Sequence, residues 1–139
     1  FVNFTPTKMF FNPDFSVIDA TIFKRKDWYY MFLKNENPKP AEKNIRITKS
    51  KQAAGPYPTV VSEPITGNYW AEGPTILTIG ESVYVYFDKY VDHKYGAVRS
   101  KDLEKWEDVS DQIMFTEDIR HGTAFKVTKK VFEKLKRNL

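Results

Sequence analysis

The stretch ATIFKRKDWYYMFLK, residues 20–34, has a counterpart later in the chain in PTILTIGESVYVYFD, residues 74–88. Each stretch holds two runs rich in Val, Ile, Tyr, Phe and Thr on either side of a turn, Lys26-Asp27 in the first and Gly80-Glu81 in the second. Such runs predict two strands joined as an antiparallel hairpin. The later segments ITKSK and AVRSK also match at a similar spacing, so the likeness extends past the hairpins. The chain therefore contains an internal repeat.

Each repeat predicts four short antiparallel strands, and the period of about 53 residues falls in the range typical of propeller blades. Propellers close with about 4 to 8 blades, whereas 139 residues hold roughly 2.6 periods of this length. We therefore predict an all-β fold: a partial β-propeller of about two four-stranded antiparallel blades plus flanking strands, with a C-terminal α-helix. This chain is not expected to close a ring alone.

The domain boundaries follow from the repeat. The expected parts are an outer strand of a preceding blade (1–14), two blades (15–66 and 67–116), an inner strand of a following blade (117–127) and a C-terminal helix (128–139). The last strand of the first blade is expected around Thr59–Ser62. Thr128 is a suitable N-cap for the helix, and Val131, Phe132 and Leu135 form its apolar stripe.

Composition excludes several classes of function. The net charge of +4, from 22 basic and 18 acidic residues, is spread along the chain apart from a basic stretch at 129–137, which we interpret as a solvated helix face. Neither a nucleic-acid-binding motif nor the ~20 apolar residues of a membrane span is present. The absence of cysteine excludes thiolate metal sites and cysteine nucleophiles, and two histidines leave little material for zinc. The 16% of aromatic residues suits a β core or a sugar-stacking surface.

Two carboxylates precede the predicted inner strands at matched places of the repeat: Asp19 in VIDATIF and Glu72 in AEGPTIL. Apolar neighbours would desolvate them in part and raise their pKa toward that of an acid catalyst. Neighbouring blades would direct both into one cleft, and paired carboxylates are the machinery of glycoside hydrolysis. The alternative is that both accept hydrogen bonds from backbone amides at the strand entries, and spacing does not decide between these interpretations.

Four strings carry a resemblance to a known family: VIDATIFKRKDWYYMFLK, YWAEGPTILTIGESVYVYFDKY, YGAVRSKDLEKWEDVS and RHGTAFKV. Together they resemble the later blades of glycoside hydrolase family 43, over roughly residues 11–127. The resemblance implies a five-bladed propeller of the kind found in arabinofuranosidases, β-xylosidases and arabinanases. Its most specific element is the EGP string, which follows the IDA string by one period of the repeat, with RHG later.

The resemblance implies roles for two catalytic acids. Asp19 corresponds to the aspartate that orients the acid and tunes its pKa, and Glu72 corresponds to the general acid that protonates the leaving glycosidic oxygen. The family's third acid, an aspartate general base, belongs to a first blade that no segment of this sequence matches. This chain alone is therefore expected to be inactive or nearly so.

The resemblance and the positions of the residues suggest further site residues. His121 resembles a family histidine that helps to hold a calcium ion or a water cluster, although a lone histidine is more often a core residue. Arg120 is expected to bind sugar hydroxyls or to form a structural salt bridge. Trp70 and Tyr69 suit either a sugar-stacking platform or packing between blades. Asp88 either reaches the cleft or stabilises a turn, and Lys34, Asn35 and Glu36 are expected to form a solvated loop.

The leading hypothesis is the C-terminal part of an inverting glycoside hydrolase acting on arabinan, arabinoxylan or related oligosaccharides. It requires no cofactor, apart from the calcium ion suggested near His121, and it relies on propeller blades from the same longer protein or another chain. The alternatives are a non-catalytic carbohydrate-binding propeller and a structural fragment. Neither a nucleic acid nor a membrane is an expected partner. Polymer-degrading members of the family are commonly exported, which implies a bacterial periplasmic or extracellular location, although this sequence contains no signal peptide.

Overall fold

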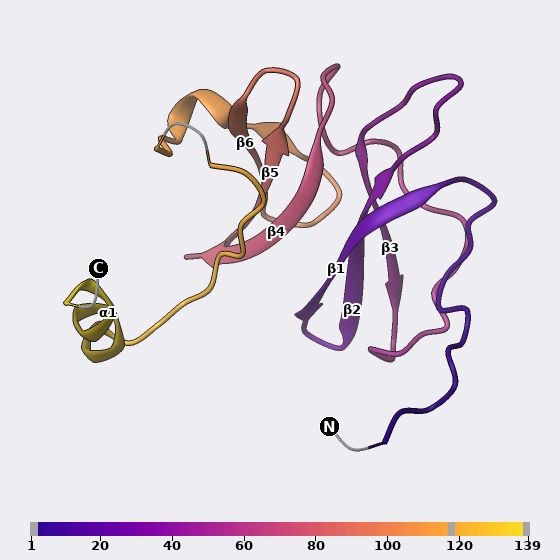
Figure 1. The fold of residues 1–139 in the computed structure, drawn as a ribbon, viewed down its shortest axis with the longest axis horizontal. Helices are drawn as coiled ribbons and strands as arrows, with labels where there is room; N and C mark the ends of the chain where they lie inside the picture. The colour runs from indigo at the N-terminus through magenta and orange to yellow at the C-terminus, as the bar shows by residue number, and fades with distance from the viewer. Residues whose placement is uncertain (1–2, 117–118, 138–139) are drawn as a thin grey trace.

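A computed structural model describes residues 3–116 and 119–137. Two antiparallel sheets lie side by side, with strand orders β1-β2-β3 and β4-β5-β6-β7 (Figure 1). The elements are β1 (Val17–Arg25), β2 (Trp28–Asn35), β3 (Ile45–Ser50), β4 (Glu72–Ile79), β5 (Ser82–Lys89), β6 (Lys94–Ser100), β7 (Glu107–Asp108), the 3-10 turn η1 (Ser110–Gln112) and α1 (Lys129–Lys136). The predicted fold class, a partial propeller with a C-terminal helix, is confirmed, and the described residues form no closed barrel.

The two hairpins β1-β2 and β4-β5 are built alike. Each turn has two residues, because Arg25 pairs with Trp28 in the first hairpin and Ile79 pairs with Ser82 in the second. Two-residue hairpin turns require a positive φ, and both turns begin with one: 53° at Lys26 and 59° at Gly80. The predicted turn positions are therefore confirmed.

An irregularity interrupts both inner strands at the same point, close to where the polar side chains gather. The register shifts between Ile18 and Thr21 in β1, and between Glu72 and Thr75 in β4. In each inner strand, regular pairing with the next strand begins directly after this irregularity, at Thr21 in β1 and at Thr75 in β4.

The strand pairing also corrects the alignment of the two repeats. Ile18 pairs with Lys34, and Glu72 pairs with Asp88 at the same place of the second hairpin. Glu72 is thus the counterpart of Ile18, and the expectation that Asp19 and Glu72 occupy matched places is wrong by one residue. The reason is that the two repeats, aligned at Thr21 and Thr75, place Asp19 opposite Gly73, the residue that follows Glu72.

One hydrophobic core joins the two sheets. The first sheet and the connection after it contribute Phe32, Ile45, Ile47, Ile65 and Ala71, and the second contributes Val83, Val85, Phe87, Val98 and Leu103. Phe23 and Trp106 pack against this cluster from the edges. The blades also exchange hydrogen bonds from side chain to backbone: Thr21 Oγ1 donates to the Pro74 carbonyl at 2.8 Å, and Arg25 Nη2 to the Lys101 carbonyl at 2.7 Å. The sheets therefore form one packed unit.

The first sheet has three strands, and the fourth strand predicted around Thr59–Ser62 is absent. That segment still lies along β3, because the backbone N–H of Ser62 donates to the carbonyl of Ile47 at 2.8 Å. A regular ladder cannot form there because Pro56, Pro58 and Pro64 lack the backbone donors that it requires.

The terminal segments lie outside both sheets. Residues 3–14 and 119–128 form no strand, since neither makes a backbone ladder with another described strand; residues 1–2 and 117–118 of the expected flanking strands lie outside the described residues. Their assignment to neighbouring blades stays a prediction.

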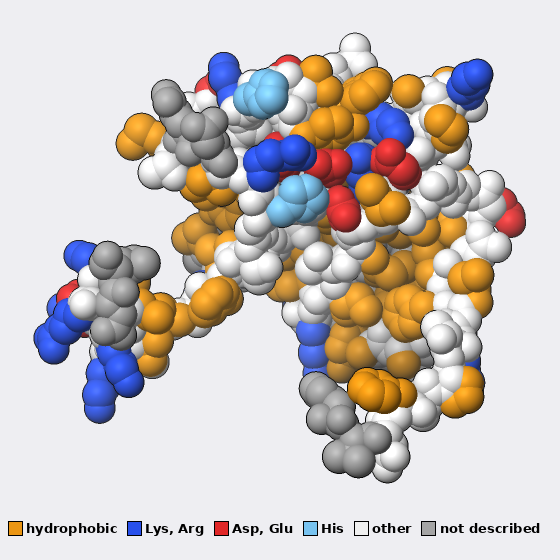
Figure 2. All heavy atoms as spheres, in the orientation of Figure 1, with side chains coloured by type: hydrophobic (Ala, Val, Ile, Leu, Met, Phe, Trp, Pro, Cys, Tyr) orange, Lys and Arg blue, Asp and Glu red, His pale blue; other side chains and the backbone are white. Residues whose placement is uncertain are grey.

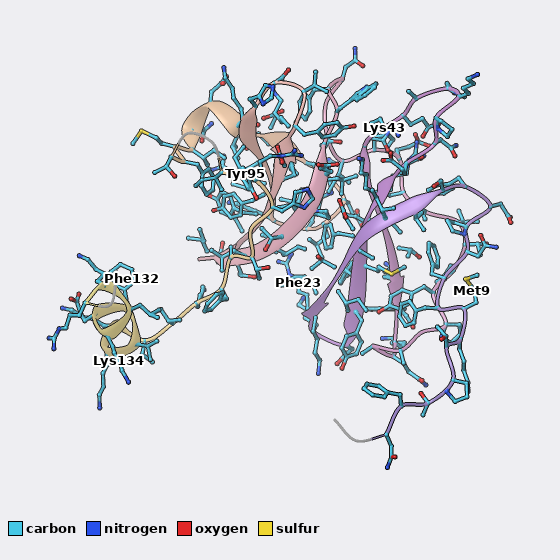
Figure 3. All side chains as sticks on the ribbon, in the orientation of Figure 1. Met9, Phe23, Lys43, Tyr95, Phe132 and Lys134 are labelled. Atoms are coloured by element: carbon cyan, nitrogen blue, oxygen red, sulfur yellow. The ribbon has the colours of Figure 1, made fainter. Side chains whose placement is uncertain are left out.

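Helix α1 forms as predicted. The Thr128 side chain accepts a hydrogen bond from the backbone N–H of Val131, which caps the first turn. Figure 3 shows Phe132 and Lys134 on this helix, away from both sheets. Phe132 and Leu135 are each 50% exposed, so the apolar stripe packs on no described part of the chain. Among the described residues, no helix has the length and apolarity that crossing a membrane requires.

Candidate functional site

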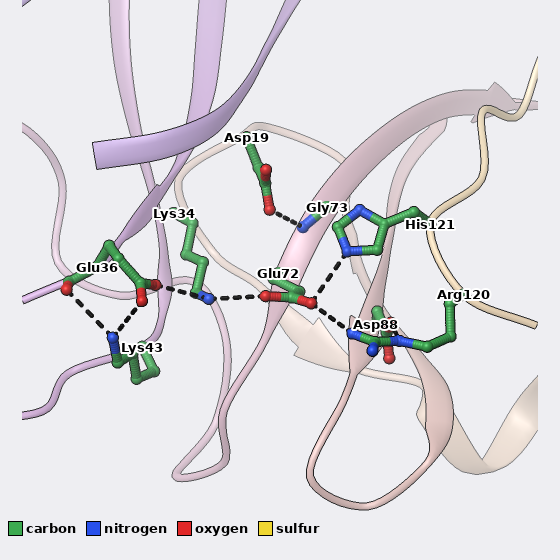
Figure 4. A network of polar contacts seen from close by, with 9 residues as sticks. All are labelled: Asp19, Lys34, Glu36, Lys43, Glu72, Gly73, Asp88, Arg120 and His121. Atoms are coloured by element: carbon green, nitrogen blue, oxygen red, sulfur yellow. Dashed lines mark hydrogen bonds and ion pairs between the residues drawn. The ribbon is translucent and has the colours of Figure 1, made fainter. Parts of the chain in front are cut away.

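A network of polar side chains lies where the two sheets meet, close to the two strand irregularities (Figure 4). Acidic, basic and histidine side chains gather on the face of the molecule shown in Figure 2. The strands supply Asp19 from β1, Lys34 from β2, Glu72 from β4 and Asp88 from β5. The connecting segments supply Glu36, Lys43, Arg120 and His121.

Glu72 stands at the centre of the network, with a side chain only 13% exposed. Its Oε2 lies 2.8 Å from Lys34 Nζ, and its Oε1 lies 2.7 Å from Arg120 Nη2 and 3.0 Å from His121 Nε2. Both carboxylate oxygens therefore have partners, and these come from two different parts of the chain. Sequence positions 34, 72 and 120–121 converge only because the two hairpins lie side by side.

Asp19 is held at the site by the neighbouring strand. Its Oδ2 accepts a hydrogen bond of 3.1 Å from the backbone N–H of Gly73, the residue after Glu72. The backbone of Asp19 is left-handed, with φ of 52°, which Asp tolerates better than most residues. Oxygens of Asp19 and Glu72 and a ring nitrogen of His121 all lie within 4.8 Å of one another. Asp19 thus makes the backbone contact that the sequence left open, and it makes this contact beside Glu72.

The network continues from Glu72 through Lys34 and Glu36 to Lys43. Lys34 is 2% exposed, and its Nζ forms ion pairs with Glu36 Oε2 at 2.7 Å and Glu72 Oε2 at 2.8 Å. Glu36 Oε1 in turn pairs with Lys43. The expectation of a solvated loop is wrong for Lys34 and Asn35, because β2 extends through both residues and the second blade covers this end of the strand.

Asp88 and Arg120 close the other side of the network. Asp88 is 2% exposed, and its Oδ2 accepts a hydrogen bond of 2.8 Å from Arg120 Nε. The Arg120 guanidinium therefore bridges Asp88 and Glu72 while remaining 57% exposed. It is a salt-bridging residue in this structure, and its exposure leaves it accessible from solvent.

The charge environment of Glu72 differs from the one that the sequence suggested. Burial by itself raises the pKa of the Glu72 carboxyl, but the hydrogen bonds and charges of Lys34 and His121 outweigh it and lower the pKa below its ordinary value. The predicted upward shift is therefore wrong for Glu72. The expectation considered apolar neighbours in sequence, whereas the fold brings cationic groups to both carboxylate oxygens.

The two aromatic residues before Glu72 have different surroundings. Tyr69 stacks on Phe87 at 5.8 Å between ring centroids, and its hydroxyl donates to Asp108 Oδ2 at 2.5 Å. Trp70 is 43% exposed and lies 5.9 Å from the ring of Tyr90. Tyr69 thus takes part in packing within the second sheet, while Trp70 retains an exposed surface.

The ligand atoms of Asp19, Glu72 and His121 lie close enough together to hold a metal ion. Calcium takes six to eight oxygen ligands and an imidazole nitrogen is a poor one. Lys34 and Arg120 already pair with the Glu72 carboxylate, and their charges oppose a divalent cation. These residues therefore do not fit calcium.

The sequence missed Lys34, Glu36 and Lys43 as members of the site. One signal was available, because the alignment of the two repeats places Lys34 opposite Asp88, which was already a candidate. No sequence signal marked Glu36 or Lys43, which approach Lys34 only after the loop between β2 and β3 folds back.

Comparison with known protein families gives one match. A family model described as "Probable glycosyl hydrolase domain", related to glycoside hydrolase family 43, matches residues 1–133. A search of curated proteins found no match.

Proposed function

Because this chain belongs to the family of probable glycosyl hydrolase domains related to glycoside hydrolase family 43, we propose that it is part of an inverting glycoside hydrolase. The proposed substrates are polysaccharides that contain arabinose or xylose. The observation that carries the proposal is the convergence of Glu72 with Asp19, Arg120 and His121 at the junction of two propeller blades. Two carboxylates and exposed hydrogen-bond donors at one point suit the protonation of a glycosidic oxygen.

In the proposed reaction, Glu72 is the general acid and Asp19 orients it. The lowered pKa makes Glu72 a carboxylate in the unliganded protein, so it must gain a proton after the substrate arrives. Arg120 and His121, which contact Oε1, are about half exposed, with side-chain exposures of 57% and 49%. A sugar hydroxyl that takes over one of these donors would weaken the stabilisation of the carboxylate. Burial, which by itself raises the pKa of Glu72, would then be opposed mainly by Lys34, so the pKa would rise toward the protonated form.

Trp70 is the proposed platform for a sugar ring, because its exposed surface lies two residues before Glu72. Apolar sugar faces stack on indole rings, which offer flat area at low cost in conformational freedom. Arg120 is proposed to contact sugar hydroxyls beside it. Asp88, a predicted binding residue, is 2% exposed and accepts a hydrogen bond from Arg120, so it is proposed to orient that guanidinium rather than to contact sugar. Tyr69 is not assigned to sugar binding, since its ring and hydroxyl are engaged with Phe87 and Asp108.

The general base is proposed to come from further blades, in the same longer protein or in another chain. The second sheet supports this, since its face away from the first sheet carries a pocket of about 310 Å³ lined largely by apolar side chains, among them Leu77, Tyr86, Tyr95 and Phe115. A blade packed there would cover this surface, and a base from another blade would activate the attacking water.

A carbohydrate-binding role without catalysis is the second candidate. The full pairing of both Glu72 oxygens favours it, because a carboxylate held by Lys34, Arg120 and His121 is a poor proton donor. Under this alternative, sugars bind to Trp70 and no bond is cleaved.

Hydrolysis of an aryl arabinofuranoside and an aryl xyloside by the full-length protein tests the proposal. Glu72→Gln should reduce kcat by about 10²- to 10⁴-fold, since it removes the proton donor. Glu81→Gln, in the exposed turn between β4 and β5, is the matched control and should leave kcat unchanged. Sugar binding without turnover, weakened by Trp70→Ala, would instead support the second candidate.

A further inference from the structure

Lys34 is the most deeply buried cation of the described network, and two carboxylates and an aromatic ring surround its ammonium group. Its Nζ lies 2.7 Å from Glu36 Oε2, 2.8 Å from Glu72 Oε2 and 4.6 Å from the centroid of the Tyr90 ring (Figure 4 shows the two ion pairs). An ammonium has three donors and no acceptor. One donor is hydrogen-bonded to Glu72 Oε2, and the ammonium group is also in ion-pair contact with Glu36 and faces the Tyr90 ring.

The surroundings of Lys34 explain how a charged group is held there. Burial by itself lowers the pKa of Lys34, but hydrogen bonds to Glu36 and Glu72 outweigh it and raise the pKa above its ordinary value. Lys43 pairs with the other oxygen of Glu36, so Lys34, Lys43, Glu36 and Glu72 carry two charges of each sign. Removing one member of a buried ion pair leaves an uncompensated charge, which is strongly destabilising. The ion pair with Lys34 therefore holds the Glu72 carboxylate in its orientation.

This contact makes the two oxygens of Glu72 unequal. Oε2 faces an ammonium group that is 2% exposed, whereas Oε1 faces Arg120 and His121, which are about half exposed. A substrate arriving from solvent can replace Arg120 or His121, but it cannot reach the Lys34 side without opening the core. Oε1 is therefore the oxygen available for chemistry.

The two repeats use this strand position in the same way. Lys34 pairs across its hairpin with Ile18, and Asp88 pairs in the same way with Glu72. Both side chains are 2% exposed, and both reach forward along the chain, Lys34 to Glu72 and Asp88 to Arg120. The same strand position thus holds a later part of the chain through an ion pair, with a base in the first repeat and an acid in the second.

We propose that Lys34 is a positioning residue for Glu72: it anchors Oε2 on the buried side and leaves Oε1 as the oxygen that meets the substrate. This rests on the proposed function for the identity of the reaction. The anchoring itself is a property of the folded chain and is measurable without any substrate.

A double-mutant cycle on the full chain tests the anchoring. Lys34→Met, Glu72→Gln and the double variant are compared by urea unfolding, and we expect a coupling of about tenfold in the unfolding equilibrium constant. Arg99→Met with Glu107→Gln is the matched control, because that ion pair has a similar length, 2.7 Å, but is exposed. Its coupling should be small. Additive effects of Lys34→Met and Glu72→Gln would overturn the proposal.

A second measurement does not depend on whether Lys34→Met folds. The Lys34 ammonium signal in ¹H–¹⁵N spectra should be protected from solvent exchange in the wild-type protein, because its donors are buried. Glu72→Gln should accelerate that exchange. An unprotected wild-type signal, or one that Glu72→Gln leaves unchanged, would contradict the anchoring.

Kinetics distinguish positioning from a purely structural role. At a temperature where both proteins are folded, Lys34→Met should lower kcat by about 10- to 100-fold and leave KM unchanged, while Arg99→Met changes neither. A raised KM with unchanged kcat would show that Lys34 contacts the substrate, and unchanged values of both would show a structural role; either overturns the proposal. These kinetics are measured on the full-length protein, which also contains the proposed general base. If that protein hydrolyses no sugar while the cycle shows coupling, the proposed function fails and the anchoring stands.

Discussion

Two residues with left-handed backbone, Asp19 (φ 52°) and Gly73 (φ 59°), bring the carboxylates together. They are counterparts in the repeat. Asp19 follows Ile18, which pairs with Lys34 near the end of β2, and Gly73 follows Glu72, which pairs with Asp88 near the end of β5. The resulting kinks place the Asp19 carboxylate on the backbone N–H of Gly73 and leave room for the His121 ring. Local backbone conformation at two positions therefore sets the geometry of the site.

Substitution of Gly73 tests this dependence. A Cβ at Gly73 would lie 2.8 Å from His121 Nδ1, so Gly73→Ala should displace the His121 ring in addition to straining the backbone. Gly80→Ala is the matched control, because Gly80 has the same φ of 59° and no atom within 4 Å of the added Cβ. Each substitution should cost about 1–2 kcal/mol of stability through its φ, and only Gly73→Ala should weaken sugar binding measured by calorimetry. Equal binding by the two variants would contradict this role of Gly73.

The ion pairs also predict how stability depends on pH. Hydrogen bonds from Lys34 and Lys43 lower the pKa of Glu36, and Lys34 and His121, opposed by burial, lower the pKa of Glu72. Both carboxyls return to an ordinary pKa of about 4.3 on unfolding. Their contribution to stability is therefore complete above about pH 4.3 and is lost as the pH falls through their folded pKa values. Urea midpoints should decline over that acidic range, and Glu36→Gln should flatten the decline; an unchanged slope would refute the assignment.

At the scale of secondary structure, hairpins and caps form from local signals. The turns at Lys26-Asp27 and Gly80-Glu81 agree with the sequence prediction. The third strand of the first sheet also forms as predicted, but the segment beyond it is too rich in proline to continue the ladder. Local chemistry therefore decides both where strands form and where one fails.

Helix α1 gives a prediction at the same scale. Thr128→Ala removes the oxygen that caps the first turn and should cost the helix about 1 kcal/mol. Because none of the described residues of α1 is buried, the loss should appear in the helical circular dichroism signal while the thermal midpoint of the sheets stays constant. Thr128→Ser, which keeps a capping hydroxyl, is the control. A lower sheet midpoint in Thr128→Ala would show that the helix packs on the blades.

At the scale of the whole molecule, a shared core makes the two blades one unit. Phe32 of the first sheet meets Trp106 of the second in an edge-to-face contact, with ring centroids 6.0 Å apart. Buried residues of both sheets belong to the same hydrophobic cluster. The first blade also has a smaller cluster of its own around Met31, Leu33 and Tyr57, but the larger cluster is shared by the two blades.

This shared core predicts cooperative unfolding. Phe32→Ala removes a fully buried ring and should destabilise both blades by about 3–5 kcal/mol. Unfolding should remain a single transition, with fluorescence of Trp28 and Trp106 changing at the same urea concentration. Val131→Ala, on the exposed stripe of α1, is the control and should leave the midpoint unchanged. Two separate transitions would show that the blades fold independently.

The sequence by itself determined the repeat, the hairpin turns, the helix cap and the candidates Asp19, Glu72, Asp88, Arg120 and His121. Each depends on local pattern or on a short motif, which neighbouring residues suffice to specify. The tertiary structure alone decided the pairing of Lys34 with Glu72. It also decided the direction of the shift in the pKa of Glu72, because the cations that lower it come from positions far away in the chain. Electrostatic interactions depend on distance in space, and only the packing of the two blades fixes that distance.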